Sequence, residues 1–278
     1  MLSHKLGLGT VQFGLKYGIS NTSGQTTAPE VSRILQYAAT QGITVIDTAS
    51  AYGNAEAVLG ENDLSSFSVV SKFITPDSVN TIEAQFYHTL QQLQVKSLYG
   101  YLAHRPAEIL KEPSQWKKIK DLQQKGLLQK IGFSLNTTDE LDALLQKQFI
   151  PELIQVPYNY LDNRFENQML TLKEKGCEIH TRSAFLQGLF FKEVQTLPAF
   201  FDVVRPVLKN VQAQTQNLSG ALLQFVCSKP FIDKVIIGVE TQQQLMDNIA
   251  GLNNTVELEP STIKIPEAVL MPSNWPQA

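Results

Sequence analysis

The stretch that decides the fold is residues 43–53, which read Ile-Thr-Val-Ile-Asp-Thr-Ala-Ser-Ala-Tyr-Gly. The β-branched run at 43–46 predicts a buried strand of the kind found in parallel sheets. The strand ends in a carboxylate, Asp47, and a phenol, Tyr52, follows five residues later with Gly53 behind it. Because α/β folds place their chemistry at the carboxyl ends of strands, these side chains are candidates for an active site.

Two further strand-like runs end in polar side chains of complementary chemistry. Lys72 follows the run 68–71, and His104 follows the run 98–103. A free phenol has a pKa of about 10, and a neighbouring ammonium lowers that value. A carboxylate keeps the lysine charged and oriented, and an imidazole can hold a substrate carbonyl or relay a proton. Each residue alone has an ordinary structural interpretation, but the four together predict a proton-transfer site.

Extended and helical patterns alternate along the 278 residues, which favours an α/β fold with a parallel sheet. Eight such units without two-residue hairpin signals predict a (β/α)8 TIM barrel, built as a single domain over residues 1–278. The alternative is a doubly wound open sheet, but residues 7–12 lack the third glycine of its usual first turn. The expected helices are 29–40, 54–59, 78–93, 113–124, 137–145, 163–175, 219–227 and 241–250, and the last two strands are 177–181 and 234–237.

The composition excludes several classes of protein. A net charge of −3 without long basic runs argues against nucleic-acid partners and against an anionic membrane surface. The chain starts without the apolar core of a signal peptide and contains no apolar run of about 20 residues, so we expect a cytoplasmic protein. Cys177 and Cys227 are too few for a disulfide framework and are expected to be buried thiols. We expect no metal.

The succession of motifs resembles the aldo-keto reductase superfamily, in particular its bacterial members. Asp47-Thr48-Ala49-x-x-Tyr52-Gly53, continued by Glu56 and Leu59-Gly60, is similar to the family signature. This resemblance implies reduction of an aldehyde or ketone to an alcohol, with hydride from a nicotinamide and a proton from Tyr52. It also implies a catalytic set of Tyr52, Asp47, Lys72 and His104. The remaining motifs, in chain order, lie at 9–10, 71–72, 102–106, 125–126, 131–134, 154–159, 183–189, 235–238 and 245–248.

The resemblance further implies a nicotinamide dinucleotide lying across the catalytic face, NADP(H) first and NAD(H) as the alternative. Family positions for the carboxamide, the pyrophosphate, the ribose phosphate and the adenine are matched along the chain. The implied cofactor-binding residues are Thr10, Asp47, Ser134, Gln155, Arg182, Ser183, Phe185, Gln187, Gly188, Gly238, Glu240, Gln244, Asp247 and Asn248.

Three positions depart from the family pattern. Leu135 follows Ser134 where an asparagine is common, and Arg182 precedes Ser183 where an aromatic residue commonly stacks on the nicotinamide. Glu240 stands where a serine or a basic residue commonly lies near the 2′-phosphate. A carboxylate there would repel the phosphate of NADPH and could accept a bond from the free ribose hydroxyl of NADH.

The expected substrate pocket is aromatic with polar tips, lined by Phe13, Tyr17, Phe73, Arg105 and Tyr158. Such a lining suits a small carbonyl compound, either a sugar or an aromatic aldehyde. The segment 184–215 lacks clear periodicity and is expected to cover the cofactor or the substrate. The tail after Leu252 is expected to lie over the barrel, with Trp275 as its anchor. We expect a monomer or a small homo-oligomer.

Two other functions remain open from the sequence. Some members of the superfamily, such as potassium-channel β subunits, associate with other proteins while holding NADPH, so a regulatory or interaction subunit is one alternative. A barrel isomerase or aldolase that uses Lys72 for a Schiff base is the other. A carboxylate and a phenol beside Lys72 favour a charged lysine, which argues against the Schiff base.

Overall fold

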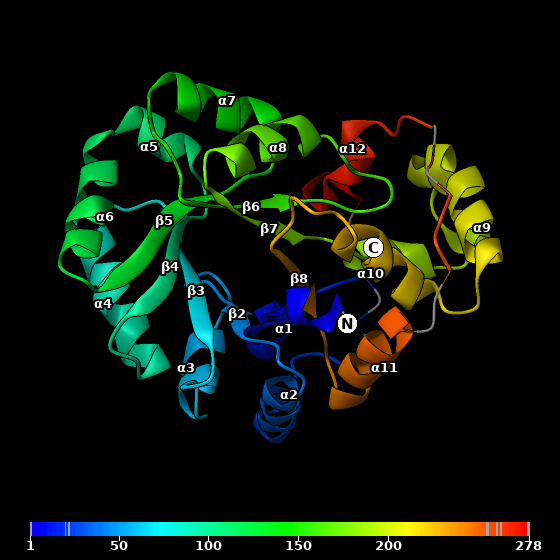
Figure 1. The fold of residues 1–278 in the computed structure, drawn as a ribbon, viewed down its shortest axis with the longest axis horizontal. Coiled ribbons are helices and arrows are strands. Elements are labelled where there is room, and N and C mark those ends of the chain that lie inside the picture. The colour runs from blue at the N-terminus through cyan, green and yellow to red at the C-terminus, as the bar shows by residue number, and fades with distance from the viewer. Residues whose placement is uncertain are drawn as a thin grey trace.

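The computed structural model describes residues 2–19, 21, 23–253, 256–259, 261 and 263–276. Within these residues eight parallel strands form a closed barrel, in which each strand pairs with the next and β8 pairs with β1 (Figure 1). The predicted (β/α)8 TIM barrel is therefore confirmed, and the open sheet is excluded because the two edge strands pair with each other. The strands are β1 Leu6–Gly9, β2 Val45–Asp47, β3 Ser68–Phe73, β4 Leu98–Ala103, β5 Leu128–Ser134, β6 Leu153–Pro157, β7 Glu178–Arg182 and β8 Lys234–Gly238.

The eight predicted helices are present with small shifts at their ends, and four further helices, at 11–14, 107–111, 205–214 and 267–270, were not predicted. The helix expected over 78–93 begins only at Ile82, because the Thr81 side chain accepts a hydrogen bond from the Ala84 N–H and caps it. The capping start expected at residue 137 is present, since Thr137 and Glu140 form a complete capping box. The helices are α1 Val11–Gly14, α2 Ala28–Thr40, α3 Ala55–Gly60, α4 Ile82–Leu93, α5 Ala107–Lys111, α6 Ser114–Gln124, α7 Thr138–Gln146, α8 Glu166–Glu174, α9 Arg205–Gln214, α10 Leu218–Cys227, α11 Gln242–Asn253 and α12 Glu267–Leu270.

The barrel interior has an apolar belt across its middle and polar groups at both ends. The belt is one cluster of buried side chains from five strands: Val45, Val70, Leu102, Leu153 and Ile236. Because side chains alternate between the two faces of a strand, every second residue of each strand points inward. Positions at the carboxyl ends of the strands therefore lie on one side of the belt, and positions at the strand starts lie on the other.

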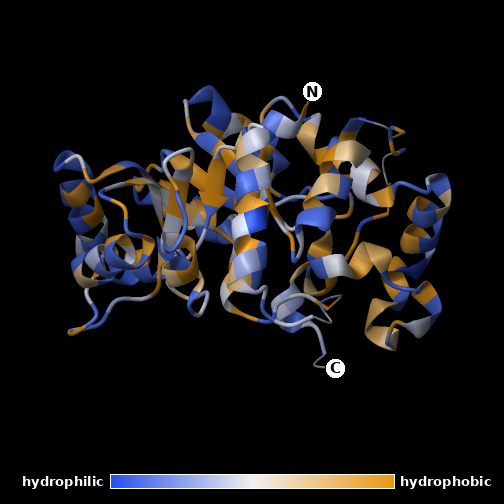
Figure 2. Ribbon diagram, turned by 90° about the horizontal axis from the view of Figure 1, so that it is seen from below, coloured by the Kyte–Doolittle hydropathy of each residue, from blue (hydrophilic) through white to orange (hydrophobic). Residues whose placement is uncertain are grey.

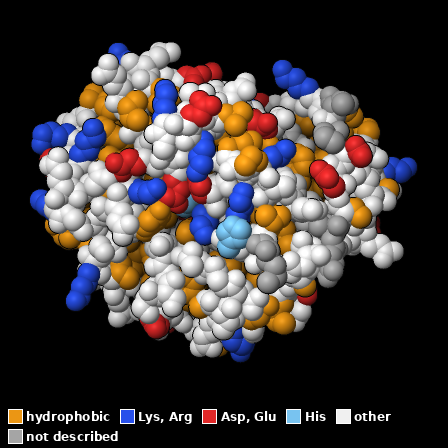
Figure 3. All heavy atoms as spheres, in the orientation of Figure 1, with side chains coloured by type: hydrophobic (Ala, Val, Ile, Leu, Met, Phe, Trp, Pro, Cys, Tyr) orange, Lys and Arg blue, Asp and Glu red, His pale blue; other side chains and the backbone are white. Residues whose placement is uncertain are grey.

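The larger core lies between the strands and the surrounding helices. The outer helices show both hydrophobic and hydrophilic residues along their length, as expected for amphipathic helices that cover a sheet (Figure 2). Acidic and basic side chains are interspersed on the face seen in Figure 3. None of the helices among the described residues combines the length and the apolar character that a bilayer crossing requires.

The segment after β7 forms a second hydrophobic cluster beside the barrel. It contains short 3-10 turns, among them Leu186–Phe191 and Ala199–Val204, followed by α9 at the edge of the molecule in Figure 1. The expectation for 184–215 is thus correct only for its first residues, which border the catalytic face. The ring of Trp275 packs edge-to-face on Phe201 at 5.1 Å, and its Nε1 donates to the Val269 carbonyl oxygen at 2.8 Å. Trp275 therefore anchors the tail to this hydrophobic cluster beside the barrel.

Candidate active site

The four predicted catalytic side chains meet at the carboxyl ends of β2, β3 and β4. Lys72 is fully buried, and its Nζ donates to Asp47 Oδ1 at 2.6 Å, to the Thr48 carbonyl oxygen at 3.0 Å and to the Tyr52 hydroxyl at 3.4 Å. The rings of Tyr52 and His104 lie edge-to-face with their centroids 5.8 Å apart. The phenol is thus held between an ammonium and an imidazole.

A close approach of two backbone segments fixes the turn that bears Tyr52. Gly53 has φ +59, and a Cβ at Gly14 would lie 1.8 Å from the Tyr52 carbonyl oxygen. A side chain at either glycine would push the turn away from α1. The glycine that follows the phenol in the sequence therefore has a structural reason: it sets the height of Tyr52 above the barrel.

The electrostatics of the site follow from burial beside several positive charges. Burial would by itself lower the pKa of Lys72, but the charges and hydrogen bonds of Asp47 and Tyr52 outweigh it and raise that pKa. Burial, together with the charges of Lys72, Arg182 and Arg105, lowers the pKa of His104 to about 3. At neutral pH the imidazole is uncharged, so one ring nitrogen donates a hydrogen bond and the other accepts one.

A cavity of about 1180 Å³ opens over this cluster. Tyr52, Asp47 and His104 line it, whereas Lys72 lies beneath its floor. This volume exceeds the usual range for a single small ligand, about 300–1,000 Å³, so the cavity has room for a dinucleotide together with a substrate. All the residues that the sequence placed around a cofactor contribute to its wall: Thr10, Asp47, Ser134, Gln155, Arg182, Ser183, Phe185, Gln187, Gly188, Gly238, Glu240, Gln244, Asp247 and Asn248.

Gln155 faces this cavity with an unused acceptor. Its Nε2 donates to Asp47 Oδ2 at 2.7 Å, but its Oε1 is buried and has no hydrogen-bond partner among the described residues. A buried amide oxygen without a partner is costly, so a ligand N–H at this point would complete its hydrogen bonding. Gln155 also holds the second oxygen of Asp47, which fixes the carboxylate that bonds Lys72.

Comparison with known proteins gives the family. A model of the aldo/keto reductase family matches residues 5–270. The chain belongs to this family. The holo structure of an aldo-keto reductase from Bacillus halodurans has a TM-score of 0.72 at 19% identity, covering 92% of this chain and 88% of that one. An aldo-keto reductase from Klebsiella pneumoniae, in complex with NADPH, has a TM-score of 0.66 at 19% identity, covering 92% and 87%. A search of curated proteins returned no match.

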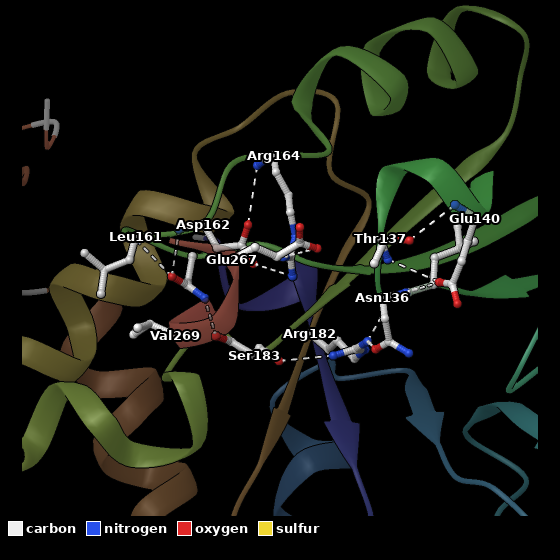
Figure 4. A network of polar contacts seen from close by, with 12 residues as sticks. Asn136, Thr137, Glu140, Leu161, Asp162, Arg164, Arg182, Ser183, Glu267 and Val269 are labelled. Atoms are coloured by element: carbon white, nitrogen blue, oxygen red, sulfur yellow. Dashed lines mark hydrogen bonds and ion pairs between the residues drawn. The ribbon is translucent and has the colours of Figure 1, made fainter. Parts of the chain in front are cut away.

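In this aldo/keto reductase Arg182 is held across the ends of two strands that are not neighbours. Its guanidinium donates to the Leu135 carbonyl oxygen at 2.9 Å and to Asn136 Oδ1 at 2.7 Å, and lies 3.4 Å from Ser183 Oγ (Figure 4). The arginine starts from β7 and reaches the loop after β5. Two of the departures from the family pattern, Leu135 and Arg182, are therefore in direct contact.

Glu240 lies at the cavity wall just before α11. Its backbone N–H donates to Gln244 Oε1 at 2.7 Å, and partial burial raises the pKa of its carboxyl. A second carboxylate caps the same helix, since Glu30 Oε1 accepts from the Gln242 N–H at 2.6 Å. The start of α11 is thus provided with negative charge by the protein itself.

Three of the five residues predicted for the substrate pocket do not line this cavity. Phe13, Phe73 and Tyr158 are buried in the core and do not line the cavity. Phe73 packs on Tyr101 behind the sheet, because its place in β3 turns it outward, away from the neighbouring Lys72. The Tyr158 hydroxyl donates to Glu166 at 2.7 Å.

Tyr17 and Arg105 do line the cavity. The Tyr17 hydroxyl accepts a hydrogen bond from Gln187 Nε2 at 2.7 Å, which joins the loop after β1 to the loop after β7 across the opening. The cavity wall also contains residues that were not predicted from the sequence: Arg164, Asn136, Gln12 and the tail residues at 270–273. Arg164 and Asn136 follow β6 and β5, so their place after a strand of a barrel was a usable signal.

Proposed function

We propose that this aldo/keto reductase uses NAD(P)H to reduce an aldehyde or ketone to an alcohol at the cavity over Asp47, Tyr52, Lys72 and His104. The observation that supports the proposal most strongly is the hydrogen bond between the buried Lys72 and the Tyr52 hydroxyl, at the wall of a cavity of about 1180 Å³. A phenol next to an ammonium and open to a ligand is suited to proton donation.

The residues of the cavity fit a nicotinamide dinucleotide. The free Oε1 of Gln155 can accept from a carboxamide N–H, and Ser134 lies beside it in the pairing of β5 with β6. The residues 183–188 would hold the pyrophosphate, and Gln244, Asp247 and Asn248 the adenosine end. The reduced dinucleotide, when bound, supplies the hydride that adds to the carbonyl carbon. The structural relative from Klebsiella pneumoniae is in complex with NADPH, which supports a cofactor of this class.

The four side chains then have distinct roles. Tyr52 donates its proton to the carbonyl oxygen as negative charge develops there. Lys72 stabilises the phenolate that remains, and Asp47 keeps Lys72 charged and in place. His104, uncharged at neutral pH, donates a ring N–H to the same carbonyl oxygen and orients it.

The cofactor is NADP(H) on family precedent, with NAD(H) as an effective competitor. Glu240 lines the cavity just before α11, where its carboxylate would lie close to a 2′-phosphate, and the Glu30 carboxylate caps the same helix from outside the cavity wall. Like charges at such a site weaken the binding of a phosphate and leave a ribose hydroxyl unaffected.

The test combines binding and turnover in one preparation. NADPH and NADH are titrated by fluorescence quenching, and the oxidation of each is then followed with a panel of aldehydes, keto-sugars and quinones. We expect binding of both dinucleotides and oxidation with at least one class of carbonyl. Tight binding without oxidation across the panel would favour a regulatory subunit. Borohydride trapping of a substrate on Lys72 would instead indicate Schiff-base chemistry, which the ion pair of Lys72 with Asp47 argues against.

A further inference from the structure

Three arginines line the cavity: Arg105, Arg164 and Arg182. They differ in their counter-ions. Arg164 NH2 lies 3.2 Å from Asp162 Oδ2, and its NH1 lies 3.1 Å from Glu267 Oε1, so this guanidinium is neutralised by the protein (Figure 4). Arg164 thereby joins the loop after β6 to the tail, and its charge is not available to a ligand.

Arg182 forms no ion pair with a carboxylate among the described residues, and Asp162, whose carboxylate interacts electrostatically with Arg182, is paired with Arg164. The hydrogen bonds of Arg182 go to a backbone carbonyl, an amide oxygen and a hydroxyl, all of them neutral. These contacts orient the guanidinium without cancelling its charge. A guanidinium fixed in this way is well suited to binding a planar anion, because little side-chain freedom is lost when the anion binds.

Arg105 also lacks an ion pair within the described part of the chain. It follows His104 directly at the end of β4, and it is exposed at the cavity wall. The strand β4 is the neighbour of β5, whose loop holds the guanidinium of Arg182. Both arginines therefore belong to the same side of the cavity mouth. The charges of both also contribute to the lowered pKa of His104, which agrees with positions close to the imidazole.

The acidic wall residues do not neutralise this pair. Asp47 is bonded to Lys72 and Gln155, while Glu240 and Asp247 belong to the segment from β8 to α11. The part of the cavity next to Tyr52 and His104 therefore has an excess of positive charge. Such a charge in a walled cavity attracts anions and excludes cations.

We propose that the physiological substrate is a carbonyl compound with a carboxylate or phosphate group, and that Arg105 and Arg182 bind this group. The inference rests on the proposed reductase function and replaces the neutral sugar or aromatic aldehyde as the expected substrate class. The anion is held by the two guanidinium groups while the carbonyl oxygen lies between Tyr52 and His104. The pyrophosphate of the cofactor is the other possible source of the same chemistry, and the experiment separates the two.

The experiment uses two aldehydes that differ in one charge: succinic semialdehyde and its methyl ester. The ratio of their kcat/KM values is measured for the wild type, for Arg105→Gln, for Arg182→Gln and for the control Lys117→Gln, which removes an exposed charge from α6. A charge-assisted hydrogen bond corresponds to roughly a 10- to 100-fold effect. We expect the wild type to prefer the acid at least tenfold, each arginine variant to lose about tenfold of that ratio, and Lys117→Gln to keep it.

Two binding measurements keep the outcomes distinct. Succinate, which has no reducible carbonyl, is titrated calorimetrically into each protein, and the dissociation constant for NADPH is measured separately. If both aldehydes are reduced equally well and succinate does not bind, the reductase function stands and the anionic substrate is wrong. If neither these aldehydes nor any carbonyl compound of the panel is reduced, but succinate binding depends on both arginines, the reductase function is wrong and the anion site stands. If Arg182→Gln weakens NADPH binding tenfold and leaves the substrate ratio unchanged, the anion is that of the cofactor and the proposal is wrong.

Discussion

Two polar clusters at opposite ends of the barrel interior contain the same four kinds of side chain. The first is the candidate active site at the carboxyl ends of the strands, with Asp47, Tyr52, Lys72 and His104. The second lies at the strand starts and consists of Glu178, Tyr99, Lys130 and His180. Each has a carboxylate, a phenol, an ammonium and an imidazole, and the apolar belt separates them.

The two polar clusters differ in the hydrogen-bond partner of the phenol. In the second cluster Tyr99 donates to Glu178 Oε2 at 2.5 Å, and burial together with this carboxylate raises the pKa of Tyr99 to about 12. Lys130 and His180 also bond Glu178, at 2.5 and 2.7 Å. In the first cluster the phenol accepts from a lysine, and the carboxylate is bound by Lys72 and Gln155 instead.

The kinds of residue present do not by themselves make a tyrosine a proton donor. The Tyr99 hydroxyl donates its proton to a carboxylate within the protein, whereas the Tyr52 hydroxyl accepts from Lys72 at the wall of the cavity. None of the four residues of the Glu178 cluster is among those that line the cavity over Tyr52. We therefore interpret the second cluster as structural, in agreement with its place at the amino-terminal face of the barrel.

The largest expected effect is the difference in kcat between Tyr52→Phe and Tyr99→Phe. Tyr52→Phe removes the proton donor, so kcat should fall by at least about 10²–10⁴-fold with cofactor affinity nearly intact. Tyr99→Phe should leave kcat within about threefold and lower the free energy of unfolding by about 1–3 kcal/mol, because a hydrogen bond to a carboxylate is lost. Steady-state kinetics and urea unfolding of both variants check this. A Tyr52→Phe enzyme that kept more than about a tenth of wild-type kcat would contradict the assignment.

Substitution of Lys72 and of Lys130 should also affect kcat differently. Lys72→Met should lower kcat by about 10²-fold or more, whereas Lys130→Met should not. Lys72→Met also leaves Asp47 buried without its cation, which costs about 3–5 kcal/mol. The double variant Asp47→Asn with Lys72→Met removes both charges, so it should regain stability without regaining activity. Recovery of activity in the double variant would show that Lys72 is only structural.

The polar cluster around Glu178 should make the free energy of unfolding depend on pH. Burial alone would raise the pKa of Glu178, but bonds from His180, Lys130 and Tyr99 outweigh it and lower that pKa to about 2. An unfolded glutamate has a pKa of about 4.3, so the stabilisation is present above that value and is lost as the pH falls toward about 2. Its size is on the order of 3 kcal/mol.

Glu178→Gln should therefore lower the free energy of unfolding by about 2–3 kcal/mol at pH 7 and flatten its decline between about pH 5 and pH 2. Denaturant unfolding at several pH values checks this, with Glu174→Gln on the surface of α8 as the control. An unchanged pH profile in Glu178→Gln would mean that the carboxylate does not stabilise the fold.

The smallest expected effect concerns cofactor choice. Like charges about 6 Å apart cost on the order of 1 kcal/mol near a screened surface, which is roughly a fivefold change in affinity. Glu240→Ser should shift the ratio of NADPH to NADH affinity toward NADPH by about that factor. Fluorescence titration of both dinucleotides measures it, and an unchanged ratio would show that Glu240 points away from the ribose.

The barrel and the convergence of the four predicted side chains could both be predicted from the sequence, because both depend on strand ends. Asp47 ends β2, Lys72 lies one residue before the end of β3 and His104 follows β4, and parallel strands bring their ends together. The aromatic pocket could not be predicted in this way. Phe73 is one residue from Lys72 yet faces the opposite side of the sheet, and Phe13 belongs to a short helix whose orientation depends on packing.

The tail was predictable only in part. Its content of Pro and Asn indicated a segment that lies over the barrel, but the pair of Arg164 with Glu267 joins residues far apart in the sequence. The Glu178 cluster was missed for the same reason, since its members come from three different strands and none of them ends its strand as a catalytic residue would.

The most direct test follows the hydride and the proton donor in one experiment. NADPH deuterated at C4 on the transferred side is mixed with a reducible carbonyl and with wild type, Tyr52→Phe or Tyr99→Phe. We expect deuterium on the former carbonyl carbon of the alcohol, which should form at wild-type rate with Tyr99→Phe and at least about 10²-fold more slowly with Tyr52→Phe. Loss of the reaction in Tyr99→Phe with retention in Tyr52→Phe, or an alcohol without the label, would contradict the proposed mechanism.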